Sequence, residues 1–338
     1  EILRCLVGSE MCIRDSYDRR DSSREDGSAG SGHGPRGKSE QIQKKEGSKQ
    51  MEKAKVYFTK ALTPEAVIKL YDVLGAELPG KVAVKVHSGE VGNQNFIRPA
   101  FFKPVIDHVK GVIVECNTAY EGKRSTTEDH WETMKLHGWT DVAEVDIMDA
   151  EGDMTLPVPE GKRIQENYVG AHLERYDSML VLSHFKGHPM GGFGGTLKNI
   201  SIGIASAYGK AVIHGAGKAE EIWTADHDSF LESMADADQS IVKHFKGNMA
   251  FINVMCNMSV DCDCCAVAED PKAADIGILS SLDPVALDQA CLDLVYQADD
   301  PGKADLIERI ESRNGVHTVE AAAALGVGSR EYELVSLD

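Results

Sequence analysis

SHFKGHPMGGFGGTLKN, residues 183–199, is the stretch that decides the predicted fold. The apolar run before it, residues 179–182, predicts a buried strand, and residues 200–205 after it predict another packed segment. Two histidines, two lysines and five glycines therefore leave the end of a strand together, in a loop whose glycines let the backbone approach a ligand. Because ligands bind at the carboxyl ends of strands in open α/β sheets, we expect a binding site here.

Strands and helices alternate along the rest of the chain. Thr63, Arg98 and Asp283 each precede a proline and predict helix starts, and Thr126 or Thr127 predicts a fourth. Further strands are predicted at residues 53–59, 81–87, 111–116, 249–255, 274–280 and 332–336. The predicted fold class is α/β, with a largely parallel or mixed sheet flanked by helices.

Three regions have weaker patterns. Residues 141–176 predict short strands and turns, and residues 219–245 predict a helix. Residues 209–217 are rich in turn-forming residues, and the short apolar run 211–213 predicts a strand that ends at His214.

The composition limits the classes of function. The chain has 338 residues and a net charge of −18, which argues against general binding to nucleic acid or to an anionic membrane. No apolar run reaches the ~18 residues of a membrane span, so we expect a cytoplasmic protein without a membrane partner. Four of the eight cysteines lie between Cys256 and Cys265, which favours metal or redox chemistry in a reducing compartment.

Residues 1–50 differ in composition from the rest of the chain. They carry 10 basic and 9 acidic residues, against 26 and 45 in the remaining 288. Residues 5–16 resemble a translated sequencing adapter, so we expect residues 1–50 to be a disordered, non-native extension and Met51 to be the native start. A native disordered tail is the alternative. Residues 51–338 then form a single α/β domain or two lobes, about 51–175 and 176–338.

The clustered cysteines are candidate metal ligands. Thiolates select soft ions such as zinc, copper(I) or iron–sulfur clusters. Cys262, Cys264 and Cys265 match neither the ferredoxin spacing nor a zinc ribbon, and further ligands must come from elsewhere. We predict that His184 and His188 complete the set; Gly187 and Pro189 exclude a helix there and place both histidines on a loop. The alternative is that these cysteines are buried small hydrophobic residues.

The remaining polar candidates lie near predicted strand ends. We predict catalytic roles for Lys85, His87, Lys198 and His214, and we expect the histidines and cysteines to surround one cleft because parallel strands end at the same sheet edge. A basic, polar pocket suits a small anionic molecule, and the predicted substrate-binding residues are Asn117, Arg124, Gly194, Gly195 and Asn199. The alternative is that the histidines are structural and that lysines such as Lys186 are solvated. The glycine stretch fits neither a P-loop nor G-x-G-x-x-G.

Several segments together resemble the DUF362 family. They are KVHSGE at 85–90, ECNTAYEGKR at 115–124, SHFKGH at 183–188, GFGGTLKN at 192–199, CDC at 262–264 and DIGILSSLDPVALD at 275–288. The resemblance covers Met51 to Asp338. Family members are often labelled iron–sulfur centre proteins, which implies a metal ion or an iron–sulfur cluster as cofactor. Many relatives carry an inserted ferredoxin-like module, and nothing of that kind lies between His214 and Met249.

These observations lead to three functional hypotheses. The first is a metal- or iron–sulfur-centre-binding redox enzyme with a small anionic substrate and a redox partner protein. The second is a metal-independent isomerase or lyase that uses histidine and lysine for acid–base chemistry. The third is a non-catalytic binding protein.

Overall fold

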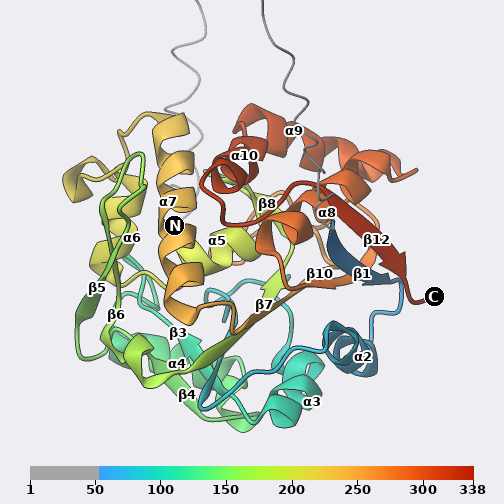
Figure 1. Cartoon of the computed structure of the whole chain (residues 1–338), viewed down its shortest axis with the longest axis horizontal. Helices are drawn as coiled ribbons and strands as arrows, with labels where there is room; N and C mark the ends of the chain where they lie inside the picture. The colour runs from blue at the N-terminus through green and yellow to red at the C-terminus, as the bar shows by residue number, and fades with distance from the viewer. Residues whose placement is uncertain (1–52) are drawn as a thin grey trace, which may run out of the picture. The chain divides into compact units, whose positions relative to one another are not determined.

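The computed structural model describes residues 53–338, and the expectations for residues 1–50 lie outside this range. Eight strands form one sheet in the order β12-β1-β11-β10-β7-β2-β3-β4 (Figure 1). They are β1 (Ala54–Thr59), β2 (Val82–Lys85), β3 (Val112–Glu115), β4 (Val145–Ile147), β7 (Ser178–His184), β10 (Met249–Met255), β11 (Gly277–Ser281) and β12 (Tyr332–Ser336). Two small antiparallel pairs accompany the sheet: β5 (Asp153–Pro157) with β6 (Glu166–Gly170), and β8 (Lys186–His188) with β9 (Gly192–Gly194).

Only β11 runs against the other strands of the large sheet. β10, β7, β2, β3 and β4 pair in parallel, and β11 pairs antiparallel with both β10 and β1. The α/β fold with a mostly parallel sheet is therefore confirmed. Because β2, β3, β7 and β10 point the same way, their carboxyl ends meet at one edge of the sheet.

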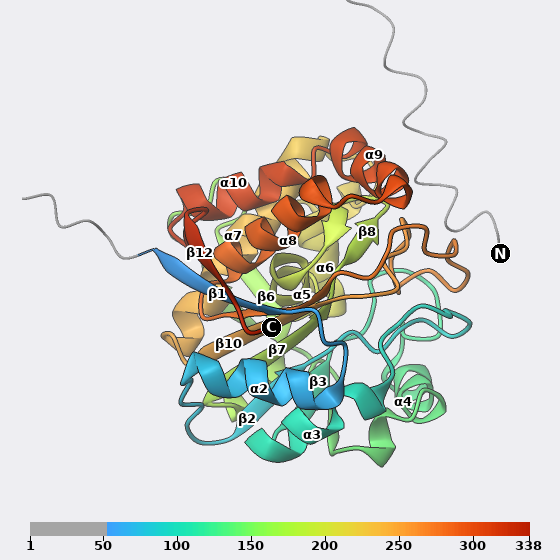
Figure 2. The ribbon, with the colours of Figure 1, turned by 90° about the vertical axis from the view of Figure 1, so that its right-hand side faces the viewer.

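Helices cover both faces of the sheet (Figure 2). Successive residues of a strand face opposite sides, so Met179 and Val181 pack in one apolar core and Leu180 and Leu182 in the other. The helices are α2 (Pro64–Leu74), α3 (Pro99–Val109), α4 (Thr127–Leu136), α5 (Thr196–Ser201), α6 (Ala207–His214), α7 (His227–Phe245), α8 (Pro284–Gln297), α9 (Ala304–Ser312) and α10 (Val316–Ala324). The 3₁₀ turns are η1 (Trp139–Asp141), η2 (Ala171–Arg175), η3 (Ala219–Glu221) and η4 (Pro301–Lys303). No helix among residues 53–338 is long and apolar enough to cross a membrane.

The predicted helix starts are confirmed. Thr63 caps α2 through its side chain, Thr126 caps α4, and Asp283 accepts hydrogen bonds from the first amides of α8. α3 begins at Pro99, as predicted, although Arg98 makes no side-chain cap. Local capping chemistry was sufficient for these elements because both partners lie within four residues.

The strand predicted at residues 211–213 is wrong. This run belongs to helix α6, which Ser206 caps by accepting a hydrogen bond from the Gly209 amide. Gly209 lies against β6, where a Cβ atom would be 1.9 Å from the Tyr168 carbonyl oxygen. Gly209 therefore allows helix α6 to pack closely against β6. The sequence pattern had instead indicated a turn at this glycine.

The glycine stretch is also more ordered than the predicted loop. Lys186–His188 pairs with Gly192–Gly194 in a short hairpin, and α5 follows it directly. The amides of Thr196 and Leu197 at the start of α5 donate to the buried carboxylate of Asp288, at 2.8 and 2.9 Å. Gly195 leaves room for that carboxylate, because a Cβ atom there would lie 2.5 Å from Asp288 Oδ1. Asp288 thus caps a neighbouring helix from inside the core.

The substitution Asp288→Ala is expected to lower the free energy of unfolding by roughly 2–4 kcal/mol, because two helix amides and the Asn253 side chain lose their acceptor in a buried place. Urea unfolding followed by circular dichroism measures this change. The exposed Asp299→Ala variant is the control and should stay within about 0.5 kcal/mol of wild type. A loss below about 1 kcal/mol for Asp288→Ala would contradict the capping role.

Candidate functional site

The candidate site lies where β2, β7 and β10 end. His87 follows β2, His184 closes β7, and Cys256 opens the cysteine loop after β10. The loop after β2 fixes the cysteine loop through amide side chains. Asn93 Nδ2 donates to the Cys265 carbonyl oxygen at 2.9 Å, and Asn95 Nδ2 donates to the Glu269 carbonyl oxygen at 2.9 Å. Segments about 170 residues apart in the sequence thereby share one surface of the site.

The structure brings the glycine stretch and the cysteine cluster together. One nitrogen of His188 and the sulfurs of Cys262 and Cys264 lie within 4.8 Å of one another. Cys262 and Cys265 close a turn, with the Cys265 amide donating to the Cys262 carbonyl oxygen at 2.9 Å. The Cys264 amide points at the Cys262 sulfur at 3.4 Å. His188 and Cys262 are buried and Cys264 is half-buried, so the group opens to solvent on the Cys264 side.

The two neighbouring sulfurs differ in character. Burial by itself would raise the pKa of Cys262, but a hydrogen bond from Cys264 and the charges of Lys198 and Lys186 bring that pKa well below its usual value. The same hydrogen bond, with Cys264 as the donor, raises the pKa of Cys264 to about 12. Cys262 is therefore the sulfur of the pair that loses its proton more readily, and the thiolate is the form that binds metal.

Two neutral imidazoles lie beside Cys262. Removal from water lowers the pKa of His87 to about 4, and it also lowers the pKa of His188; in both rings a hydrogen bond with Cys262 acts in the opposite direction. His188 Nδ1 accepts hydrogen bonds from the amides of Met190 and Gly191, at 3.2 and 2.8 Å. His87 Nδ1 accepts one from the Gly89 amide at 3.1 Å. In both neutral rings the hydrogen consequently resides on Nε2.

His184 does not belong to the converging donors. Its Nδ1 lies 2.9 Å from Asp263 Oδ2, and its Nε2 lies 2.6 Å from the Cys256 carbonyl oxygen. Both partners only accept hydrogen bonds, so each ring nitrogen of His184 is placed as a donor. Lys186 Nζ places a positive charge 3.2 Å from Asp263 Oδ2. Although predicted as a metal ligand, His184 instead anchors the residue between the two cysteines.

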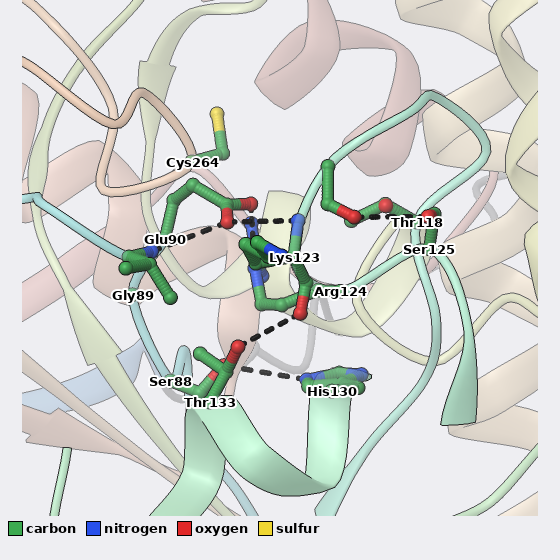
Figure 3. Close-up of polar contacts among 12 residues, drawn as sticks. Ser88, Gly89, Glu90, Thr118, Lys123, Arg124, Ser125, His130, Thr133 and Cys264 are labelled. Atoms are coloured by element: carbon green, nitrogen blue, oxygen red, sulfur yellow. Dashed lines mark hydrogen bonds and ion pairs between the residues drawn. The ribbon is translucent and has the colours of Figure 1, made fainter. Parts of the chain in front are cut away.

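Most cations predicted to bind an anion already have acidic partners. Lys85 Nζ lies 2.7 Å from Glu115 Oε2 and 2.9 Å from Asn199 Oδ1. Arg124 Nε donates to Glu90 Oε2 at 3.2 Å, with Cys264 on the adjacent loop (Figure 3). These pairs are buried and fix the walls of the site. Lys198, on α5, is different: no acceptor among residues 53–338 lies within hydrogen-bonding distance of its ammonium group.

The other predicted residues have structural contacts. Asn117 links β3 to α4 by accepting from His130 Nδ1 at 3.2 Å and donating to Thr127 Oγ1 at 3.0 Å. Gly194 lies against the aliphatic part of Lys186, and Gly195 makes room for Asp288. His214 ends α6 and not a strand, and its ring stacks on Phe230 with centroids 4.7 Å apart.

Sequence reasoning missed Asp263 and Lys186. Lys186 was taken to be solvated, yet it is buried and paired with Asp263. The available signal was the C-D-C alternation at residues 262–264, because an aspartate within a cysteine cluster is buried only when a partner compensates its charge. The partner, Lys186, lies 77 residues earlier in the chain, so the residues around Asp263 could not indicate it.

The substitution Asp263→Ala should reduce the free energy of unfolding by about 3–5 kcal/mol, since the buried ammonium group of Lys186 would lose its counter-charge and His184 would lose its buried acceptor. Equilibrium urea unfolding provides the measurement. Asp270→Ala is the matched control on the same loop, where the exposed side chain predicts a change within about 0.5 kcal/mol. Equal effects of the two substitutions would refute the anchoring role of Asp263.

The chain is similar to one protein family and to several solved structures. A family described as a domain of unknown function, DUF362, matches residues 82–293. A solved structure from Thermotoga maritima matches 77% of this chain and 58% of its own, with 14% identity and a TM-score of 0.40. The lactate racemase apoprotein from Thermoanaerobacterium thermosaccharolyticum matches 85% of this chain and 83% of its own, with 13% identity and a TM-score of 0.41.

This chain thus spans 58% of the length of the Thermotoga protein. The search of curated proteins gave no match. The DUF362 match covers more than half of the chain, from the start of β2 into α8. It includes every strand end that contributes to the candidate site, and the chain belongs to the DUF362 family.

Proposed function

We propose that the protein is an enzyme that binds one soft metal ion at His188, Cys262 and Cys264 and acts on a small anionic molecule. The convergence of one nitrogen and two sulfurs within 4.8 Å supports this proposal. Two sulfurs and an imidazole suit zinc, copper(I) or iron. Three protein ligands leave a fourth position open, which is typical of catalytic sites.

The donor set fits a single ion better than a cluster. A four-iron cluster ordinarily takes four cysteine thiolates, whereas the converging group contains two sulfurs. Cys256 is a poor third thiolate, since burial raises its pKa to about 12. A bound ion would supply Lewis acidity and lower the pKa of a bound water molecule. Iron or copper would also allow the redox chemistry predicted from the sequence, so the identity of the metal separates these reaction classes.

The chain's own residues supply the remaining functions. The ammonium group of Lys198 has no hydrogen-bond acceptor among the described residues, which suits an anionic substrate. His87 lies beside Cys262 with its Nε2–H directed away from the backbone contact, so it can hold or donate a proton. The pairs Lys85–Glu115 and Arg124–Glu90 stiffen the walls around these groups.

A metal-independent isomerase or lyase is the second candidate, and the histidine tautomers favour it. A metal-binding histidine normally keeps its second nitrogen protonated, yet Nδ1 of His188 accepts two backbone hydrogen bonds. Metal binding at Nε2 therefore requires the proton to move to Nδ1 and the Gly191 contact to open. Without that change, His87 and His188 are two neutral acid–base groups beside a thiolate.

Protein purified without oxygen should contain about one metal ion per chain, and Cys262→Ser, Cys264→Ser and His188→Ala should each lower that stoichiometry at least about tenfold because each removes one of three donors. Elemental analysis by mass spectrometry gives the stoichiometry and the identity of the metal. Cys291→Ser is the control, since this buried cysteine lies on α8 in the apolar core.

Metal content that is equal in all four variants would contradict the site. Wild-type protein without metal, with activity that survives a chelator, would favour the acid–base enzyme. Sulfide at the stoichiometry of a cluster would show that additional thiolates take part.

A further inference from the structure

The two halves of the candidate metal site meet in a close backbone contact. The Gly187 amide of β8 donates to the Ser259 carbonyl oxygen at 2.8 Å, which joins the β8–β9 hairpin to the cysteine loop. A Cβ atom on Gly187 would lie 2.3 Å from the Val260 carbonyl oxygen, so only glycine lets the two backbones come this close. His188 directly follows Gly187, and Cys262 lies two residues after Val260. This contact therefore governs the distance between the proposed metal ligands.

Helix α9 lies beside β8 and contacts both partners of this backbone contact (Figure 2). Arg309 and Arg313 are four residues apart at its C-terminal end, so their side chains share one side of the helix. Arg309 Nη1 donates to the Val260 carbonyl oxygen of the cysteine loop at 2.8 Å. Arg313 Nε donates to the Pro189 carbonyl oxygen of the hairpin at 2.7 Å. Pro189 directly follows the proposed ligand His188, so each arginine is bonded close to a metal-binding residue.

The position of α9 is itself fixed by the rest of the fold. Leu306 and Ile310 are buried in the apolar core. Nε2 of His227, on α7, donates to the Arg313 carbonyl oxygen at 2.8 Å. Gly192, in the hairpin, has a φ of 78°, and a Cβ atom there would lie 3.0 Å from the Ile310 carbonyl oxygen. The hairpin thus packs directly on the end of a helix that the core holds in place.

The kind of acceptor distinguishes these two arginines from the other cations near the site. Lys85 and Arg124 pair with carboxylates of neighbouring side chains. Arg309 and Arg313 instead bind backbone carbonyl oxygens, and Asp261 Oδ1 lies 3.4 Å from the same nitrogen of Arg309. A hydrogen bond to a carbonyl oxygen fixes the path of the backbone, and the backbone determines where the ligand side chains begin.

We propose that Arg309 and Arg313 are positioning residues that hold the hairpin and the cysteine loop at the separation that the three metal-binding donors need. This pair is called the arginine clamp below, and the inference rests on the metal-binding function proposed above. A guanidinium group has no acceptor site, so neither arginine can be a ligand itself. Residues that orient metal ligands from outside typically change metal affinity 10–100-fold when they are removed.

Cobalt(II) titration of the full chain, purified without oxygen and freed of metal by a chelator, tests the clamp. The absorption bands of thiolate-bound cobalt report binding, and competition with a chelator gives the dissociation constant. Arg309→Met and Arg313→Met should each bind cobalt at least about tenfold more weakly than wild type. Arg309→Lys keeps the charge and a donor for the single carbonyl contact, and it should bind within about threefold of wild type.

Hydrogen exchange of the metal-free protein measures the hairpin contact without any metal. The Gly187 amide should exchange at least about tenfold faster in Arg309→Met and Arg313→Met than in wild type, because local opening of its bond to Ser259 becomes easier. Mass spectrometry of peptides that contain Gly187 gives the rate. Gly187→Ala is an independent variant that keeps both arginines. Its Cβ atom would displace the Val260 carbonyl, so it should also weaken cobalt binding about tenfold.

Arg330→Met is the matched control, because Arg330 is exposed and paired with Glu320 at 2.9 Å. It should equal wild type in both measurements, and circular dichroism confirms that each variant is folded. Unchanged exchange of the Gly187 amide in both arginine variants would overturn the proposal, as would cobalt affinity equal to that of a metal-binding wild type. A wild type that binds no cobalt, with faster exchange in the arginine variants, would support the clamp and reject the metal centre. The two proposals can therefore fail separately.

Discussion

The carboxylate of Asp263 holds two separate loops in one geometry, and the candidate site depends on this buried group. Asp263 lies between Cys262 and Cys264 in the sequence, and its carboxylate contacts His184 Nδ1 and Lys186 Nζ. His184 ends β7 and Lys186 begins the glycine hairpin. A buried carboxylate is stable only when buried partners compensate it, and removing one partner of such a group is strongly destabilising. The cysteine sulfurs and His188 therefore converge because Asp263 fixes the loop on which the sulfurs lie. The second nitrogen of His184 extends the same network to the carbonyl of Cys256 at the end of β10.

Sheet topology explains why these segments meet at all. β2, β7 and β10 are neighbours and parallel, so the loops that leave them emerge side by side. β11 runs the other way and contributes no residue to the group. Two helices carry further polar side chains that were predicted for the site. α5 carries Lys198, and the ring of His214 at the end of α6 stacks on Phe230 of α7.

The sequence was sufficient for features whose partners are close along the chain. Caps at Thr63, Thr126 and Asp283 follow from residues within one helical turn, and buried strands follow from apolar runs. The meeting of His188 with Cys262 followed from parallel topology. Pairings over long distances were not predictable: Arg124 with Glu90 is 34 residues apart, and His184 with Asp263 is 79. Periodicity also failed at α6, where Gly209 suggested a turn although it allows close packing against β6.

Zinc-edge X-ray absorption of the anaerobically purified, zinc-loaded protein tests the central claim most directly, because it reports the atoms bound to the ion. Ligation by His188, Cys262 and Cys264 predicts two sulfur neighbours at about 2.3 Å, one imidazole nitrogen at about 2.0–2.1 Å and one further light atom. A first shell with no sulfur, or with four sulfurs and no imidazole, would contradict the account.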